Sequence, residues 1–268
     1  MTAPEISIIL PVHNSGRYIR KTIDSLLAQS FRNFELIVIN DGSTDDSETI
    51  IQSYTDPRIV YYTNESNKGL IFTLNRGIFM ARGKYIARMD ADDICLPERL
   101  ELQKLWLDEH TDASMVACTI QFIDEQDAPA GAWPLDRSTI TRQAIHKTLP
   151  KENCIAHPSI MGRTGVFKAY WYAENQKNTE DYDLWLRLAA DGHIIDKINR
   201  DLLLYRVHQQ SVTQAHLRKG NMFLKLYHCK RRFVWQRIRS GKFNGFVARV
   251  MATMAYDLGV ALFKIIKR

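Results

Sequence analysis

The first 110 residues alternate short apolar segments with segments whose apolar residues recur every three or four positions. This rhythm limits the fold more than any other feature, because short apolar runs predict strands and the longer period predicts helices. Strands are expected at residues 6–10, 35–40, 59–62 and 85–89. Regular alternation of strands and helices favours a mostly parallel sheet with helices on both faces. The sequence therefore predicts an α/β fold.

After about residue 111 the rhythm changes. Further strands are expected at residues 114–123 and 194–205, and helices at 139–149 and 181–190. This pattern predicts an α+β addition that closes over the first half. We accordingly divide the chain into three parts, which are residues 1–110, 111–215 and 216–268.

Three carboxylates, Asp90, Asp92 and Asp93, directly follow the strand predicted at residues 85–89. They should lie at the carboxyl end of that strand, which is where open α/β sheets bind ligands. Oxygen ligands on a short loop suit Mg²⁺ or Mn²⁺ held beside the phosphates of a nucleotide. The alternative is a solvated acidic turn without a ligand.

Asp41 forms a second acidic position, at the end of the strand predicted at residues 35–40. With small Gly42 and Ser43 beside it, its carboxylate is suited to accept a hydrogen bond from a flat ligand edge such as a pyrimidine N–H. The alternative is that Asp41 caps the following helix. Asp45 and Asp46 are better placed for that role, which leaves Asp41 available for a ligand.

Glu180 and Asp181 form a third acidic position, at the start of the helix predicted at residues 181–190. The helix dipole stabilises a carboxylate there, so a structural role in the helix start is one interpretation. The other is a general base, because a base that takes a proton from a sugar hydroxyl needs a carboxylate facing a cleft.

The net charge of +6 hides an asymmetry between the body and the tail. Residues 216–268 carry 13 Lys and Arg against one acid, whereas the first 215 residues carry 23 against 29. The tail also shows a helical apolar stripe with aromatic residues, which favours attachment to an anionic membrane surface. The alternative is a helix packed on the body or on a second subunit, so a homo-oligomer stays open. Arg249, Asp257 and Lys264 interrupt the stripe and argue against a spanning helix.

Several other classes of protein are disfavoured. The four cysteines form no C-x-x-C pair, which predicts reduced thiols in a cytosolic protein, and no signal peptide is expected. Neither a G-x-G-x-x-G nor a P-loop motif follows the first strand. A sugar nucleotidyltransferase would show a glycine-rich signature there, which residues 11–17 do not supply. The acidic body disfavours a nucleic-acid-binding protein that uses the basic tail.

Several motifs appear in a fixed order along residues 4–212. They are P-V-H-N at 11–14, I-V-I-N-D-G-S-T-D-D-S at 37–47, N-K-G-L at 67–70, L-N-R-G-I at 74–78, A-R-G-K-Y-I-A-R-M-D-A-D-D at 81–93 and E-D-Y-D-L-W at 180–185. Together they resemble the family 2 inverting glycosyltransferases. The resemblance implies the GT-A fold, a Rossmann-like, mixed, mostly parallel sheet flanked by helices. The first half would bind the nucleotide sugar, the second half the acceptor, and a basic helical extension would follow.

The same resemblance implies roles for the acidic residues. Asp41 would bind the base of a nucleoside diphosphate sugar, usually uracil, and Asp90 would approach the ribose and the sugar. Asp92 would ligate Mn²⁺ or Mg²⁺ bridging the two phosphates. Asp181 would be the catalytic base, with Glu180 supporting it.

Further residues are implied around the nucleotide. Pro11 and His13 would line the nucleoside pocket, and Lys68 would reach a base or a phosphate, although an exposed lysine is the ordinary alternative. The segment 205–208, followed by Ser211, also resembles a family feature. In it His208 is a candidate second metal ligand or diphosphate contact, and Arg206 is a candidate phosphate partner.

The resemblance also implies the substrates. The donor would be a nucleoside diphosphate sugar, and the acceptor a glycan or a lipid-linked oligosaccharide in polysaccharide or lipopolysaccharide assembly. No Q-x-x-R-W string follows the expected base, which argues against a processive synthase. We therefore expect single additions by a cytoplasmic enzyme that contacts the membrane peripherally through its tail and binds no nucleic acid.

Overall fold

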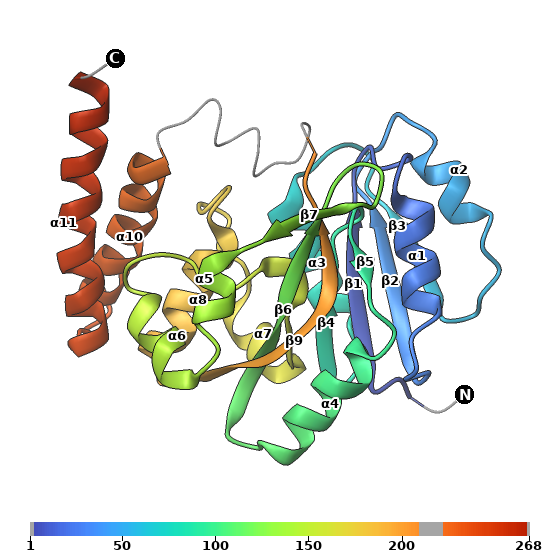
Figure 1. The fold of residues 1–268 in the computed structure, drawn as a ribbon, viewed down its shortest axis with the longest axis horizontal. Coiled ribbons are helices and arrows are strands. Elements are labelled where there is room, and N and C mark those ends of the chain that lie inside the picture. The colour runs from blue at the N-terminus through green and yellow to red at the C-terminus, as the bar shows by residue number, and fades with distance from the viewer. Residues whose placement is uncertain (1–2, 209–221, 267–268) are drawn as a thin grey trace.

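The computed structural model describes residues 3–208 and 222–266. Within them, nine strands form one mixed sheet in the order β3-β2-β1-β4-β8-β6-β9-β5, with β7 beside β6 (Figure 1). The strands are β1 (Ile6–Val12), β2 (Phe34–Asn40), β3 (Ile59–Thr63), β4 (Tyr85–Arg88), β5 (Ile94–Cys95), β6 (Ala113–Ile123), β7 (Pro129–Ala132), β8 (Met161–Arg163) and β9 (Ile194–Arg206).

The first four strands are parallel, so their carboxyl ends meet at one edge of the sheet. Their registers pair Val12 with Asn40 and Ile9 with Arg88, which places the residues that follow β2 and β4 at that same edge. Antiparallel β8 lies between β4 and β6 and joins the two halves of the chain into one sheet. The sheet thus continues across the predicted division at residue 110.

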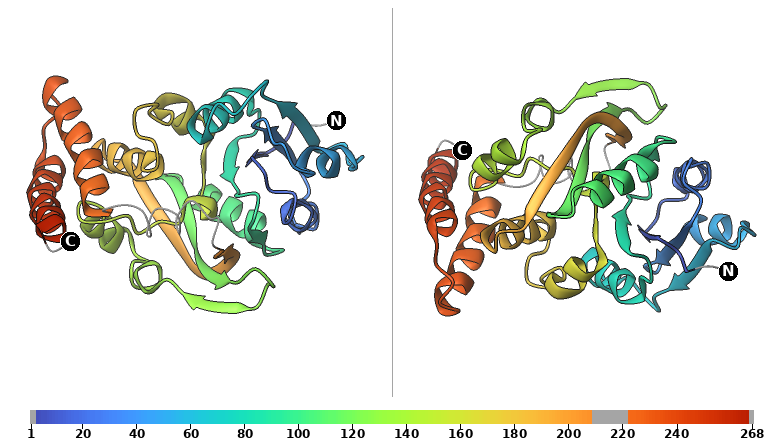
Figure 2. Two further views of the ribbon diagram at one scale, coloured as in Figure 1. Left: turned by 90° about the horizontal axis from the view of Figure 1, so that it is seen from above. Right: turned by 90° about the horizontal axis from the view of Figure 1, so that it is seen from below.

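Helices cover both faces of the sheet (Figure 2). The helices of the body are α1 (Ile19–Leu27), α2 (Ser47–Gln52), α3 (Leu70–Met80), α4 (Arg99–Glu109), α5 (Pro134–Ser138), α6 (Arg142–Thr148), α7 (Thr164–Tyr170) and α8 (Glu180–Ala190), with a 3-10 turn η1 at His157–Ser159. Strand β1 shows why two cores form: Ile8 and Leu10 pack with α1 and α4, whereas Ile9 packs with α3. Side chains alternate between the faces of a strand, so a wholly apolar strand supplies both cores.

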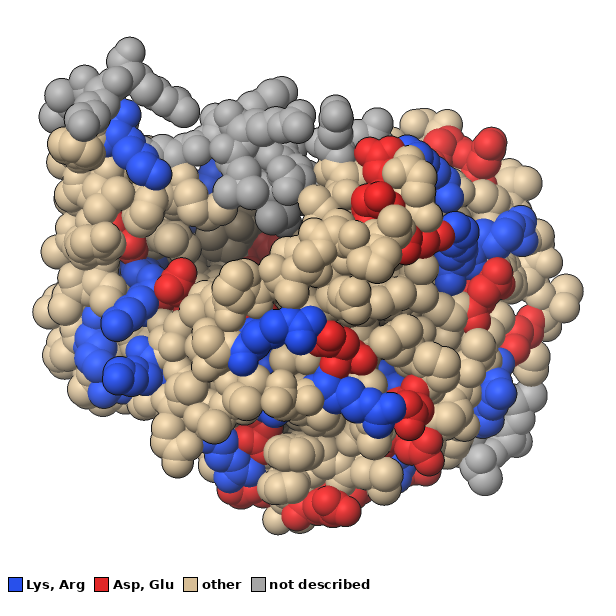
Figure 3. Space-filling model, viewed as in Figure 1, with Lys and Arg blue, Asp and Glu red and all other residues tan. Residues whose placement is uncertain are grey.

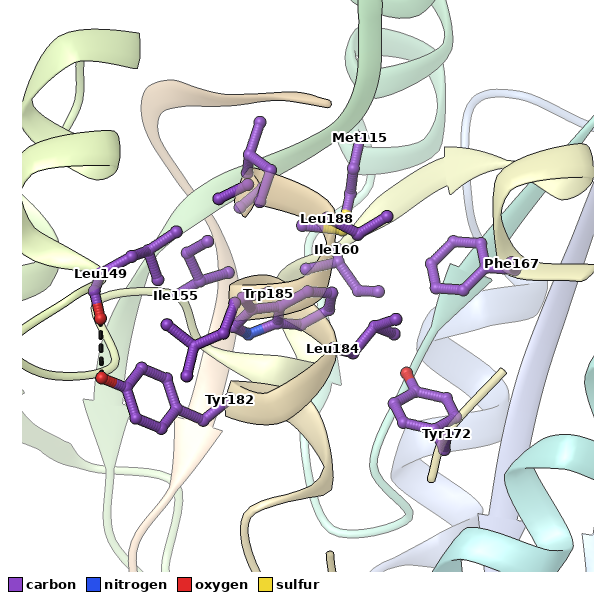
Figure 4. Close-up of a cluster of buried hydrophobic side chains, with 14 of the residues drawn as sticks. Met115, Leu149, Ile155, Ile160, Phe167, Tyr172, Tyr182, Leu184, Trp185 and Leu188 are labelled. Carbon is purple, nitrogen blue, oxygen red and sulfur yellow. Dashed lines mark hydrogen bonds between the residues drawn. The ribbon is translucent and has the colours of Figure 1, made fainter. Parts of the chain in front are cut away.

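The larger core surrounds α8, whose Trp185 and Leu184 are fully buried among residues of α3, α6 and α7 (Figure 4). The hydroxyl of Tyr182 donates to the carbonyl of Leu149 at 2.6 Å, so the polar end of this buried ring is satisfied. Helix α8 is therefore held on several sides. Its first residue, Glu180, starts the segment that carries the predicted base.

The predicted α/β architecture is confirmed, and most differences concern boundaries. Strands β5, β7 and β8 and the 3-10 turn η1 are not among the segments predicted from the sequence. All four cysteines are free and buried, as expected of reduced thiols.

The tail forms a hairpin of two helices, α10 (Met222–Arg239) and α11 (Gly245–Ile266), at one end of the molecule (Figure 1). Cys229 and Phe233 of α10 are buried in the larger core, so this helix packs on the body. Lys230 is fully buried and donates to the Asp257 carboxylate at 2.6 Å, which ties the two helices together. Ser211 and the first residues of the tail lie outside the described residues.

Among the described residues, one helix is long and apolar enough to cross a membrane by length and composition alone. Its segment Gly245–Lys264 has a mean hydropathy of 1.5, and 28% of it is buried in the protein. By composition, the charged residues of the tail therefore do not exclude a spanning helix, contrary to the prediction. Asp257 within this segment is nevertheless buried in a pair with Lys230.

Candidate active site

The loop after β4 gathers the three carboxylates predicted to bind a metal. Oxygens of Asp90, Asp92 and Asp93 lie within 4.8 Å of one another. Asp93 is 1% exposed, and burial together with the charges of Asp92 and Asp90 raises its pKa well above the ordinary value. Such crowding of like charges around a buried carboxylate is unfavourable unless a cation offsets it. These oxygens are the ligand type that Mg²⁺ and Mn²⁺ prefer.

Asp93 gives a further sign that the cluster fits a cation. Its Oδ1 accepts a hydrogen bond from the backbone N–H of Arg206 at 2.8 Å, but its buried Oδ2 has no partner among the described residues. A buried oxygen without a donor is rare and calls for an explanation such as an ion. The sequence motif contained Asp93, but the resemblance assigned only Asp92 and, as a candidate, His208 to the metal.

His208 lies against this cluster, because its Nε2 is 2.9 Å from Oδ2 of Asp92. Its ring also contacts Tyr18 at a centroid distance of 5.2 Å. The structure therefore places His208 beside Asp92, although 116 residues separate them. An imidazole and a carboxylate in this arrangement are able to hold one divalent cation together.

Arg206 faces the protein interior. Its Nε donates to the carbonyl of Asp92 at 2.7 Å, its Nη1 donates to the carbonyl of Asp124 at 2.7 Å, and it pairs with Asp127. Arg206 is 1% exposed, and its contacts hold the loops around the cluster. Its Nη2 has no hydrogen-bond partner among the described residues, so the predicted phosphate contact stays a prediction.

Glu180 and Asp181 occupy the first turn of α8 and face the same region. Burial and the charge of Asp181 raise the pKa of Glu180 to about 7, and burial raises the pKa of Asp181. Oδ2 of Asp181 accepts from Nδ2 of Asn153 at 2.8 Å, and Oδ1 accepts from the backbone N–H of Tyr182 at 2.7 Å. The two contacts orient the carboxylate. Asn153 carries no motif, so nothing in the sequence distinguished it.

Arg88 is a second residue that sequence reasoning passed over, although an arginine in an otherwise apolar strand is a visible signal. Its guanidinium pairs with both oxygens of Asp90. The charge of Arg88 also lowers the pKa of Glu180 and Asp181, so the two acidic positions face one cation. Half-buried His157 and buried Tyr172 border this region and are hydrogen-bonded at 2.7 Å through Nε2 and the hydroxyl.

Asp41 is arranged differently, because donors within the protein surround it. Oδ1 accepts from the backbone N–H of Lys68 and from Nδ2 of Asn64, at 2.8 and 2.7 Å, and Oδ2 accepts from the N–H of Gly69 at 2.8 Å. Asp41 therefore anchors the loop before α3. It does not cap α2, whereas Oδ1 of Asp45 accepts from the N–H of Ser47 at 3.0 Å.

The loop that contains Lys68 approaches the turn after β2 very closely. Gly42 has a φ of +67°, and a Cβ there would lie 2.7 Å from the backbone N of Asn67. His13 joins the same group, with its Nδ1 3.0 Å from the carbonyl of Asp41 and its Nε2 3.0 Å from Nδ2 of Asn67. Pro11 is buried within β1, and Lys68 is exposed.

The predicted residues thus form two groups at the carboxyl edge of the parallel strands. The first group consists of Asp41, His13 and the backbone of Lys68, and is here called the Asp41 group. The second group is here called the acidic centre. Its members are connected by the Asp92–His208 contact and by Arg88, which binds Asp90 and acts electrostatically on Glu180 and Asp181. Its members are Arg88, Asp90, Asp92, Asp93, Glu180, Asp181 and His208. Among the described residues, no hydrogen bond joins the two groups.

Comparisons with known proteins identify the family and the fold of this chain. The model of glycosyl transferase family 2 matches residues 7–171. The O-antigen biosynthesis glycosyltransferase WbnJ of Escherichia coli is 36% identical over 217 residues, which covers 79% of this chain and 83% of that protein. The putative glycosyltransferase EpsE of Bacillus subtilis is 33% identical over 216 residues, covering 78% and 75%.

Solved structures share the fold. S. aureus TarS, residues 1–349, in complex with UDP-GlcNAc superimposes with a TM-score of 0.73 at 20% identity, covering 95% of this chain and 71% of that one. The mannosyltransferase PcManGT from Pyrobaculum calidifontis, in complex with GDP-Man and Mn²⁺, gives a TM-score of 0.67 at 15% identity and covers 98% and 76%. The chain therefore belongs to glycosyltransferase family 2 and is a nucleotide-sugar glycosyltransferase with the GT-A fold.

Proposed function

We propose that this enzyme is a metal-dependent inverting transferase that moves a sugar from a UDP-sugar to a hydroxyl of a glycan or lipid-linked oligosaccharide. The observation that carries the proposal is the acidic centre, in which Asp90, Asp92 and Asp93 lie within 4.8 Å of one another and α8 faces them through Arg88. The likeness to a TarS complex with UDP-GlcNAc supports the donor class, and the likeness to WbnJ supports cell-surface polysaccharide assembly.

The Asp41 group would bind the nucleoside. A carboxylate has about four lone-pair positions, so Asp41 is able to accept one more N–H beyond the three donors it already has. Uracil offers such an N–H on its flat edge. Pro11 and His13 would then border the base, and the exposed side chain of Lys68 would approach the base or a phosphate.

The acidic centre would bind the diphosphate end of the donor. Asp92, His208 and Asp93 would hold Mn²⁺ or Mg²⁺, because the buried Oδ2 of Asp93 otherwise has no partner among the described residues. A bound divalent cation offsets the negative charge that develops on a diphosphate leaving group. Asp90, fixed by Arg88, would contact the ribose and the transferred sugar.

Asp181 would act as the base. Asn153 and the N–H of Tyr182 fix its carboxylate, which then takes the proton of the acceptor hydroxyl as that oxygen attacks the anomeric carbon. Attack opposite the leaving diphosphate inverts the anomeric configuration in one displacement. No covalent glycosyl-enzyme forms, so no second nucleophile is required. The acidic centre would hold the acceptor oxygen and the anomeric carbon in line.

The test is a panel of nucleotide sugars, each assayed for binding and for slow hydrolysis with and without Mn²⁺. We expect one UDP-sugar to bind and be hydrolysed only with the metal, and Asp92→Asn to lose the metal-dependent binding. Asp46→Asn is the control, because Asp46 lies at the start of α2 and makes no capping hydrogen bond through its side chain. Binding that is equal with and without Mn²⁺ would contradict the metal assignment.

We further propose that the hairpin of α10 and α11 docks on the anionic cytoplasmic face of a membrane, near a lipid-linked acceptor. Large apolar side chains are exposed on it, among them Trp235 at 61% and Leu262 at 50%. Arg239 and Lys242 are exposed close to Trp235, at the turn between the helices, and Figure 3 shows basic side chains over this end of the molecule. Apolar side chains beside basic ones suit a surface of anionic lipids.

Vesicle sedimentation tests the docking with the full chain. The enzyme should bind phosphatidylcholine vesicles that contain phosphatidylglycerol, and the double variant Trp235→Ser, Leu262→Ser should bind much less. Phe79→Ser is the matched control, because Phe79 is 75% exposed on α3, outside the hairpin. If light scattering instead shows a dimer that the double variant dissociates, the hairpin is a subunit interface and the membrane proposal is wrong.

A further inference from the structure

Arg88 is a buried arginine in the middle of the sheet. It ends β4, its backbone N–H donates to the carbonyl of Ile160, and its carbonyl accepts from the guanidinium of Arg99. The residue is 3% exposed. A buried guanidinium is strongly unfavourable unless negative charge and hydrogen bonds compensate it. The position of Arg88 therefore needs an explanation beyond the stability of the strand.

The side chain of Arg88 extends to the face of the sheet that carries α8. Ile86, two residues earlier in β4, belongs to the core around α8, whereas Tyr85 and Ala87 belong to the opposite core. Strand side chains alternate, so Arg88 shares the face of Ile86. Its charge accordingly acts on Glu180 and Asp181 at the start of α8.

Arg88 is also paired within the acidic centre. Both oxygens of Asp90 bind its guanidinium, in the two-pronged geometry that arginine forms and lysine does not. The buried Nε has no hydrogen-bond partner among the described residues. One cation thus binds a carboxylate that follows β4 and also acts electrostatically on the two carboxylates that begin α8.

We propose that Arg88 is a positioning residue for sugar transfer, which fixes the Asp90 carboxylate toward the donor sugar and separates it electrostatically from Asp181. This inference rests on the proposed function, because it acts through Asp90 and Asp181. Arg88 forms no bond to the reacting atoms. Its fork orients one carboxylate, and its charge stabilises the ionised form of the other.

The surroundings of Asp181 give this proposal a measurable consequence. Besides Arg88 of β4, the ionisable groups that face Asp181 are Asp90, its neighbour Glu180, Tyr172 and Cys229 of α10. Among these groups, Arg88 is the cation, and it lowers the pKa of Asp181 against the effect of burial. Removal of this cation must therefore move the loss of activity at low pH to a higher pH.

The experiment compares Arg88→Met with Arg88→Lys, using Mn²⁺-dependent hydrolysis of the UDP-sugar that the parent enzyme turns over. Arg88→Met should lower kcat by about a hundredfold, because displacing a group at the reacting centre by roughly 1 Å has an effect of that size. Its acid limb should move to higher pH. Arg88→Lys keeps the charge and loses the fork, so its kcat should fall while its acid limb stays near that of the parent. Binding of UDP with Mn²⁺ should change little in either variant.

Arg99→Met is the matched control. Arg99 is also a buried arginine, but it binds the side chain of Gln103 and the carbonyls of Arg88 and Ile160 rather than a carboxylate. Its loss should lower stability and leave the acid limb in place. If Arg88→Met fails to fold, Arg88→Gln replaces it, because the glutamine amide still donates a hydrogen bond toward Asp90 while the positive charge is lost.

The outcomes separate the inference from the proposed function. A parent enzyme that hydrolyses no member of the panel overturns both. If the parent is active and Arg88→Met, or Arg88→Gln in its place, keeps the parent's acid limb, the inference is wrong and the proposed function stands.

Discussion

Asp41 and Asp93 are buried carboxylates at the same edge of the sheet, and they are satisfied in opposite ways. Asp41 accepts three hydrogen bonds from Asn64 and the backbone of the Lys68 loop. Asp93 accepts one, from the N–H of Arg206, and its second oxygen has no partner among the described residues. The protein alone stabilises the charge of Asp41, whereas Asp93 needs a partner from outside the chain. The difference predicts a preformed nucleoside site and a diphosphate site completed by a cation.

The largest expected effect concerns a third residue, Asp181, and separates the catalytic step from donor binding. Asp181→Asn should lower kcat by about 10²- to 10⁴-fold, the usual contribution of a general base. The Kd for UDP with Mn²⁺ should stay unchanged, because the Asp41 group and the carboxylates after β4 are intact. Steady-state kinetics and calorimetry provide the two measurements. A variant as active as the parent would remove the assignment of the base.

Asp41→Asn should have the next largest effect. The amide nitrogen would face the N–H groups that the carboxylate accepts, so buried donors lose their partners and the free energy of unfolding should fall by about 1–3 kcal/mol. UDP binding should weaken as well. Urea denaturation and calorimetry measure both quantities, and Asp46→Asn again serves as the control. Unchanged stability would mean that the Lys68 loop does not depend on this carboxylate.

Asp93→Asn should behave in the opposite way. The pKa of Asp93 is raised in the folded protein, so its folded state holds the proton more tightly than the unfolded state does. Stability therefore falls as pH rises from the unfolded pKa through the folded pKa. In EDTA at pH 7.5 the asparagine removes this penalty, and Tm should stay or rise, whereas Mn²⁺ binding should weaken. A fall in Tm like that of Asp41→Asn would contradict the comparison.

The smallest expected effect is a shift of the pH profile. Glu180 has a pKa raised to about 7 by burial and by the charge of Asp181, so the two carboxylates titrate as a pair. Glu180→Gln removes the like charge and should move the acid limb of kcat/KM to lower pH. The rate at high pH should change little. An acid limb that stays in place would show that Glu180 does not influence the base.

The architecture and the acidic motifs could be predicted because each depends on local pattern. Apolar segments of the right period predict the strands and helices, and Asp41 and Asp90 follow strands whose carboxyl ends meet at one edge. Asn153 could not be predicted, because only the packing of its loop on α8 gives it a role. A tail helix packed on the body was kept as an alternative, but its pairing with a second helix was not predicted, since the Lys230–Asp257 pair joins residues 27 positions apart.

Helix α8 begins at the acidic centre and ends against the hairpin, where Asn244 donates to the carbonyl of Ala190 at 2.8 Å and Arg237 donates to Asp191 at 2.7 Å. The hairpin is therefore no detachable anchor. It supports the far end of the helix that carries Asp181. Truncating the enzyme or fusing a protein to its C-terminus is therefore expected to displace the catalytic base as well as to change where the enzyme binds. Expression designs for this enzyme should keep both helices.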